Sequence, residues 1–82
     1  MNGELVMYTT DWCGYCIRLK RFFERESIPF REVNIEHDAE SASFVASVNG
    51  GSQTVPTIRF PTGAVVTNPT PAMVRDLMTQ TA

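Results

Sequence analysis

Residues 4–16 read ELVMYTTDWCGYC and decide the fold: a short apolar run passes through a polar connection into two cysteines three positions apart. The run from Glu4 to Tyr8 is compact and apolar, so we predict a first strand that is buried on both faces. A helix is expected from Cys13 to about Glu26, because apolar residues recur there at helical spacing. Those residues are Cys16, Leu19, Phe22 and Phe23. The cysteine pair is therefore expected where the strand gives way to the helix.

A second strand and a second helix are expected next. Residues 30–35 (FREVNI) alternate apolar and polar side chains, which predicts a strand with one half-exposed face. Asp38 is a suitable N-cap for the second helix, and residues 49–51 (NGG) supply its C-terminal stop. The apolar residues that this helix carries are Phe44, Val45 and Val48.

A hairpin and a last helix follow. Residues 56–60 (PTIRF) predict a third strand, residues 61–63 a turn, and residues 64–67 a short fourth strand. Thr70 followed by Pro71 is typical of an N-cap and the first position of a helix. The residues that this helix is expected to bury are Val74, Leu77 and Met78. The order βαβ-α-ββα predicts a four-stranded mixed sheet with helices packed on both faces.

Length and charge narrow the class of protein. An 82-residue chain fits one domain, residues 1–82. A net charge of −2 argues against a nucleic-acid binder and against attachment to anionic lipid. No apolar run approaches the ~18 residues of a membrane span, and the N-terminus lacks the features of a signal peptide. We expect a cytoplasmic monomer with no nucleic-acid or membrane partner.

The two cysteines are the strongest chemical signal. Cys13 falls at the helix N-terminus, where unpaired backbone N–H groups favour an anion and lower a thiol pKa. Cys16 lies one turn further on, on the stripe that faces the core. We expect the outer sulfur of Cys13 to attack a disulfide and Cys16 to resolve it. The alternatives are a structural disulfide, a zinc site that only His37 could join, and two inert apolar cysteines.

Two proline segments are further candidates. Val55-Pro56 is either a proline at the start of a strand or a cis bond that leaves the Val55 backbone free to pair with a substrate. Residues 67–70 (TNPT) are either a turn into a capped helix or a place where Asn68 holds a ligand carboxylate. Tyr8, Trp12 and Tyr15 are candidates for an aromatic rim, or for ordinary packing. The polar residues that we expect on solvated surfaces are Arg18, Lys20, Arg21 and His37.

These features resemble the thioredoxin superfamily, and within it the glutaredoxins and the actinobacterial mycoredoxins. Four stretches carry the likeness: residues 8–16 (YTTDWCGYC), 48–51 (VNGG), 54–57 (TVPT) and 67–69 (TNP). The resemblance implies a thioredoxin-like fold and reduction of mixed disulfides between proteins and mycothiol by a monothiol mechanism. It makes Cys13 the nucleophile and Cys16 a resolving cysteine. It implies mycothiol as reducing co-substrate, regenerated by an NADPH-dependent flavin reductase, with no bound cofactor or metal.

By position, the resemblance also implies a set of substrate-binding residues. They are Trp12, Tyr15, Thr54, Val55, Pro56, Thr67 and Asn68. Gly14 stands where glutaredoxins usually have proline, Asp11 where many have a basic residue, and residues 67–69 where they usually carry Gly-Gly-x-Asp. These departures argue against glutathione. The alternatives are a dithiol redoxin supplied by thioredoxin reductase for ribonucleotide reductase, a glutathione-dependent glutaredoxin, and a metal or cluster carrier.

Overall fold

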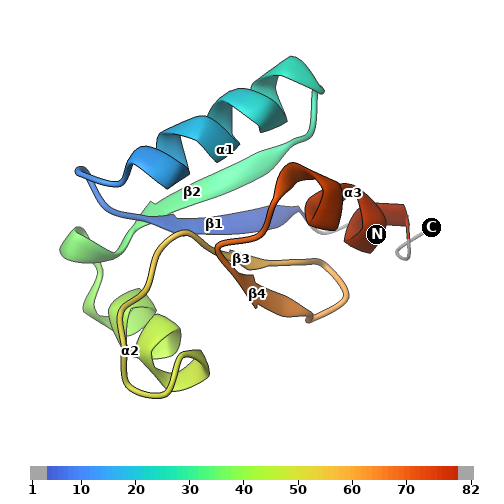
Figure 1. The fold of residues 1–82 in the computed structure, drawn as a ribbon. Helices are drawn as coiled ribbons and strands as arrows, with labels where there is room; N and C mark the ends of the chain where they lie inside the picture. The colour runs from blue at the N-terminus through green and yellow to red at the C-terminus, as the bar shows by residue number, and fades with distance from the viewer. Residues whose placement is uncertain (1–3, 80–82) are drawn as a thin grey trace.

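A four-stranded mixed sheet forms the centre of the protein (Figure 1). The computed structural model describes residues 4–79. The strands, in the spatial order β2-β1-β3-β4, are β1 (Leu5–Thr9), β2 (Phe30–Asn34), β3 (Thr57–Arg59) and β4 (Val65–Thr67). β1 pairs with β2 in parallel and with β3 antiparallel, and β3 pairs with β4 antiparallel. The predicted mixed sheet and the order of the elements are confirmed.

Three helices cover the two faces of this sheet (Figure 1). They are α1 (Gly14–Arg25), α2 (Ala39–Val48) and α3 (Pro71–Thr79), and a short 3₁₀ turn, η1 (Ile35–His37), precedes α2. α1 and α3 lie on one face, and α2 lies on the other. Within residues 4–79, no helix is long and apolar enough to cross a membrane.

The central strand β1 is buried on both faces, as predicted, because its side chains alternate between two apolar clusters. Leu5 and Met7 pack with α1 and α3, whereas Val6 and Tyr8 pack with η1 and α2. The predicted strand began at Glu4 and ended at Tyr8, but β1 runs one residue further on. Thr9 extends it, since its buried hydroxyl donates a hydrogen bond to Glu32 at 2.9 Å.

The helix caps follow the sequence closely. The Asp38 carboxylate accepts from the backbone N–H of Ser41, and the Thr70 hydroxyl accepts from that of Met73, as capping residues do. Val74 is fully buried in α3, whereas Leu77 and Met78 are half-buried against the same cluster. Val48 is exposed at the end of α2.

The boundaries of other strands also differ from the prediction. Ile35 was expected to end the second strand, but it begins η1, because the Asn34 side chain accepts from the Glu36 N–H and turns the chain. Pro56 and Phe60 lie just outside β3. Proline has no N–H to give to the ladder, and Phe60 instead pairs its N–H with the Ala64 carbonyl to close the hairpin.

Candidate functional site

The two cysteines form a disulfide at the N-terminus of α1. Cys13 is the N-cap residue with an extended backbone, and its Sγ accepts a hydrogen bond from the Cys16 N–H at 3.0 Å. Its own N–H donates to the Thr10 carbonyl, which closes the loop after β1. The predicted position of the pair, at the junction of strand and helix, is confirmed.

Both cysteines belong to the core on the α1 face of the sheet. Cys13 is 4% exposed and Cys16 is 2% exposed, and both contact the cluster that includes Leu19 and Phe23. The sequence pattern places only Cys16 on the core-facing stripe, but in this oxidised form Cys13 is buried as well. The bond to Cys16 explains the difference, because Cys16 sits on the core-facing stripe and holds the Cys13 sulfur against the first turn.

Trp12 forms one exposed border of the site. Trp12 is 72% exposed to solvent, and its indole Nε1–H donates a hydrogen bond to Glu36 Oε2 at 3.2 Å. The other oxygen of Glu36 accepts from the Asp11 N–H at 3.0 Å. Asn34 donates to the Asp11 carboxylate at 2.6 Å, so residues at the end of β2 and in η1 hold the loop before Cys13. Glu36 received no role from the sequence, because its partners lie more than 20 positions away.

Tyr15 forms a second border, toward the opposite edge of the sheet. It is 60% exposed, and the Arg18 guanidinium lies over its ring at 5.3 Å from the centroid. Arg18 therefore stands at the site rather than only on a solvated face.

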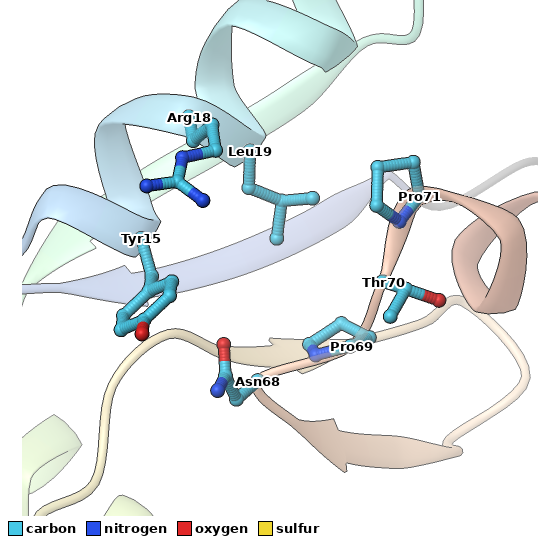
Figure 2. A pocket seen from close by; sticks show the side chains of 7 residues that line it. All are labelled: Tyr15, Arg18, Leu19, Asn68, Pro69, Thr70 and Pro71. Carbon is cyan, nitrogen blue, oxygen red and sulfur yellow. The ribbon is translucent and has the colours of Figure 1, made fainter.

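A pocket of about 240 Å³ opens beside Tyr15. Figure 2 shows α1 on one side of it and the segment that joins β4 to α3 on the other, with the Tyr15 ring turned toward Asn68. The lining residues are Tyr15, Arg18, Leu19, Asn68, Pro69, Thr70 and Pro71. The structure thus brings two of the predicted substrate-binding residues, Tyr15 and Asn68, to one hollow.

The Val55–Pro56 peptide bond is cis. Val55 packs against both apolar clusters, one of which contains the two cysteines. Among residues 4–79, no hydrogen bond engages the Val55 backbone N–H or C=O. The Pro56 carbonyl accepts a hydrogen bond from the Asn68 N–H at 2.6 Å, and this bond joins the segment to the β4–α3 turn. Asn68 adopts a positive φ of 49° there, a conformation that asparagine tolerates better than most residues.

Asn49 links α2 to the strands behind the cis bond. Its side-chain Nδ2 donates to the Val45 carbonyl at 2.8 Å and to the Thr57 hydroxyl at 3.3 Å. Its Oδ1 accepts from the Thr67 hydroxyl. The Thr67 hydroxyl is therefore already engaged within the protein, and the Thr54 hydroxyl is hydrogen-bonded to that of Ser52. The sequence suggested Asn49 only as the end of a helix, and its side-chain contacts were missed.

The surroundings of Glu32 on β2 change the pKa of its carboxyl group. Partial burial raises the pKa of Glu32, but hydrogen bonds from Lys20 and Thr9 and the charge on Lys20 lower it. The net result is a pKa below the ordinary value. Lys20 approaches the carboxylate at 2.9 Å, so this lysine is paired, while Arg21 stays exposed on α1.

Two other candidates lie away from the disulfide. Tyr8 is buried on the α2 face and its ring packs against Phe44 at 5.4 Å, so it does not border the site. His37 is exposed, 4.0 Å from Asp11. Within the described part of the chain, residues 4–79, no three His, Cys, Asp or Glu side chains are grouped so as to hold a metal ion.

Comparison with known proteins adds to this geometry. A model of the glutaredoxin family matches residues 5–63. A Mycobacterium tuberculosis protein that is named as a glutaredoxin is 51% identical over 69 residues, which cover 84% of this chain and 82% of that protein. Mycoredoxin 1 of Corynebacterium glutamicum is 36% identical over 72 residues, which cover 88% and 89% of the two chains. The crystal structure of an Archaeoglobus fulgidus glutaredoxin superposes with a TM-score of 0.76 at 25% identity, over 92% of this chain and 85% of that one.

Proposed function

This chain belongs to the glutaredoxin family of thiol–disulfide oxidoreductases, and we propose that its substrates are mixed disulfides between proteins and mycothiol. The observation that carries the chemistry is the Cys13–Cys16 disulfide at the N-terminus of α1. The observation that supports mycothiol is the 36% identity with Mycoredoxin 1 over most of both chains.

Cys13 is the nucleophile in this proposal. It occupies the N-cap of α1, where the backbone N–H groups of the first turn have no partners within the helix. The Cys16 N–H already donates to that sulfur in the disulfide. Once the pair is reduced, the same donor and the helix dipole stabilise a thiolate, the form of cysteine that attacks disulfides.

The reaction begins when the Cys13 thiolate attacks the mycothiol-side sulfur of the mixed disulfide. The bond between the two original partners breaks, the substrate protein leaves as a thiol, and a disulfide forms between Cys13 and mycothiol. A second mycothiol thiolate attacks the mycothiol sulfur of this adduct, which frees Cys13 and releases mycothiol disulfide. NADPH supplies two electrons through a flavin reductase and returns that disulfide to two thiols.

Cys16 resolves the adduct when no second mycothiol arrives. Its thiolate attacks the sulfur of Cys13, expels mycothiol and forms the Cys13–Cys16 disulfide seen in the structure. Cys16 is therefore dispensable when mycothiol is abundant and needed only for turnover through a dithiol route. We further propose that this activity takes place in the cytoplasm, because low-molecular-weight thiols keep that compartment reducing, and that the protein acts as a monomer.

The substrate contacts follow from the borders of the site. The free backbone N–H and C=O of Val55 pair with an extended segment of the substrate. Trp12 and Tyr15 offer exposed rings on either side of the disulfide, and Asn68 faces the pocket beside Tyr15. Asp11 and Glu36 place negative charge next to Trp12. Mycothiol carries no carboxylate, whereas glutathione carries two, so this charge favours mycothiol.

The test is a coupled assay that follows NADPH consumption. It contains an S-mycothiolated peptide, mycothiol and mycothiol-disulfide reductase, and it compares wild type with Cys13→Ser and Cys16→Ser. A glutathionylated peptide with glutathione and its reductase is the matched control. We expect wild type and Cys16→Ser to be active in the mycothiol assay and inactive in the glutathione assay. Loss of activity in Cys16→Ser with retention in Cys13→Ser would overturn the assignment of roles.

The Cys13–Cys16 disulfide also favours a second candidate, a dithiol redoxin that reduces protein disulfides such as that of ribonucleotide reductase. Such a protein is recharged by thioredoxin reductase without mycothiol, and both of its cysteines are essential. The same assay with thioredoxin reductase and a protein disulfide separates the two functions. Activity there, together with none in the mycothiol assay, would establish the second candidate.

A further inference from the structure

Glu36 contacts the two residues that precede Cys13. Its Oε1 accepts from the Asp11 backbone N–H at 3.0 Å, and its Oε2 accepts from the Trp12 indole N–H at 3.2 Å. One carboxylate therefore fixes both the backbone of this loop and the aromatic side chain at its end. Glu36 makes these hydrogen bonds to the loop and to Trp12, so besides its negative charge it can act on the reaction through the position of these two residues.

Glu36 is itself held in place. The Asn34 Oδ1 accepts from the Glu36 N–H at 2.8 Å, and the Asn34 Nδ2 donates to the Asp11 carboxylate at 2.6 Å. Asn34 is the N-cap of η1, so this turn sets where the Glu36 backbone lies. The contacts form a closed ring from the end of β2 to the loop before Cys13. A ring of this kind holds its members more firmly than separate surface bonds would.

This arrangement fixes the orientation of the Trp12 side chain. An indole has one hydrogen-bond donor, and the bond to Glu36 uses it. The ring is otherwise largely open to solvent, at 72% exposure. A large aromatic ring that is already fixed loses little conformational entropy when a ligand packs on it.

We propose that Glu36 is a positioning residue that holds the Trp12 indole as a preformed apolar wall beside Cys13. The low-molecular-weight thiol of the mixed disulfide packs on this wall while its sulfur meets the Cys13 thiolate. The identity of that thiol rests on the proposed function, whereas the wall rests on the hydrogen bonds above. Glu36 thus governs how well the substrate binds and leaves the attack by Cys13 unchanged.

Three substitutions test this proposal. Glu36→Ala removes both hydrogen bonds, and Glu36→Gln, with one acceptor oxygen, keeps only one of them. Trp12→Phe keeps a ring but removes the indole N–H. Glu40→Gln is the matched control, because it removes an exposed acidic charge from the first turn of α2. Thermal melting of each variant identifies any that fail to fold.

The expected result is a change in KM for the S-mycothiolated peptide with little change in kcat. KM rises about threefold to tenfold in Glu36→Ala, the range of one or two surface hydrogen bonds, and less in Glu36→Gln. Glu40→Gln leaves KM unchanged. In the Trp12→Phe background, Glu36→Ala raises KM less than it does in the wild type, because the bond to the indole is already gone and only the bond to the Asp11 N–H remains to be lost.

A second readout does not depend on activity. Trp12 is the one tryptophan of the chain, so time-resolved fluorescence anisotropy reports the motion of its indole directly. We expect faster local motion in Glu36→Ala than in wild type or Glu40→Gln. Unchanged anisotropy, or loosened motion with an unchanged KM, would overturn the positioning role. An inactive wild type in the mycothiol assay would instead refute the proposed function.

Discussion

The Cys16 backbone N–H donates to the Sγ of Cys13 at 3.0 Å, so the turn that links the two sulfurs also directs a donor at the first of them. Cys13 is the N-cap of α1, whereas Cys16 lies within its first turn, and both side chains belong to the core. The two cysteines are therefore unequal, although both are nearly buried in the disulfide. This inequality leads to a difference in their reactivity after reduction.

Reduced Cys13 should react with iodoacetamide much faster than Cys16 at neutral pH. An unperturbed thiol titrates near ~8.5 and is mostly protonated at pH 7, whereas a helix N-terminus stabilises the thiolate of Cys13. Mass spectrometry of peptides after brief alkylation, over a series of pH values, measures both sites. Equal rates at the two cysteines would contradict the role of the helix N-terminus.

Asn49→Ala should destabilise the protein by about 1–3 kcal/mol, the cost of leaving partly buried polar partners unsatisfied. Asn49 joins α2 to Thr57 and Thr67 through two side-chain hydrogen bonds and donates a third to the Val45 carbonyl of α2. Urea unfolding measures the loss. Ser47→Ala is the control, because the Ser47 hydroxyl is exposed and bonds only to the Phe44 carbonyl of its own helix. A cost for Asn49→Ala no larger than that of the control would show that the link is unimportant.

Asp11→Lys should shift thiol preference toward glutathione. The change places a cation in the loop before Cys13, next to where a carboxylate-bearing thiol would lie. The ratio of kcat/KM for glutathionylated over mycothiolated peptide should rise about twofold to fivefold, as expected for exposed charges, and less in high salt. Glu24→Lys makes the same change of charge on an exposed part of α1 and should leave the ratio unchanged. A ratio that moves equally in both variants would point to net charge rather than to position 11.

Glu32→Gln should weaken the fold at pH 7 by up to ~1 kcal/mol, because its partner Lys20 is itself about one-third exposed. The pKa of Glu32 lies below the ordinary 4.5, so the charged form stabilises the folded state. That stabilisation is complete above pH 4.5 and is lost as the pH falls through the lower folded-state pKa. The difference between variant and wild type in urea unfolding should therefore narrow under acid. A difference that grows under acid would contradict the sign of the shift.

Local sequence signals predicted most of the fold. The apolar run after Glu4, the caps at Asp38 and Thr70 and the turn at residues 61–63 each act over a few positions, and each appears where it was expected. One boundary that moved, the end of β1, depends on a distant partner. Thr9 joins β1 because Glu32 accepts its hydroxyl proton from the next strand, and no local pattern reveals such a partner.

The sequence predicted only part of the site, because the rest depends on contacts between residues that are far apart in the chain. The spacing of Cys13 and Cys16 identifies the reactive pair, because helix geometry alone brings them together. Their burial, the contact of Glu36 with Trp12 and the links made by Asn49 depend on how separate elements pack. Arg18 looks like an ordinary surface residue until the β4–α3 turn is placed opposite it.

The central claim is that Cys13 takes mycothiol from the substrate protein. A single turnover of Cys16→Ser with one equivalent of an S-mycothiolated protein, followed by intact-mass spectrometry without reductant, tests it most directly. The expected products are the free substrate thiol and a disulfide between Cys13 and mycothiol. A disulfide between Cys13 and the substrate protein, with free mycothiol released, would contradict the account.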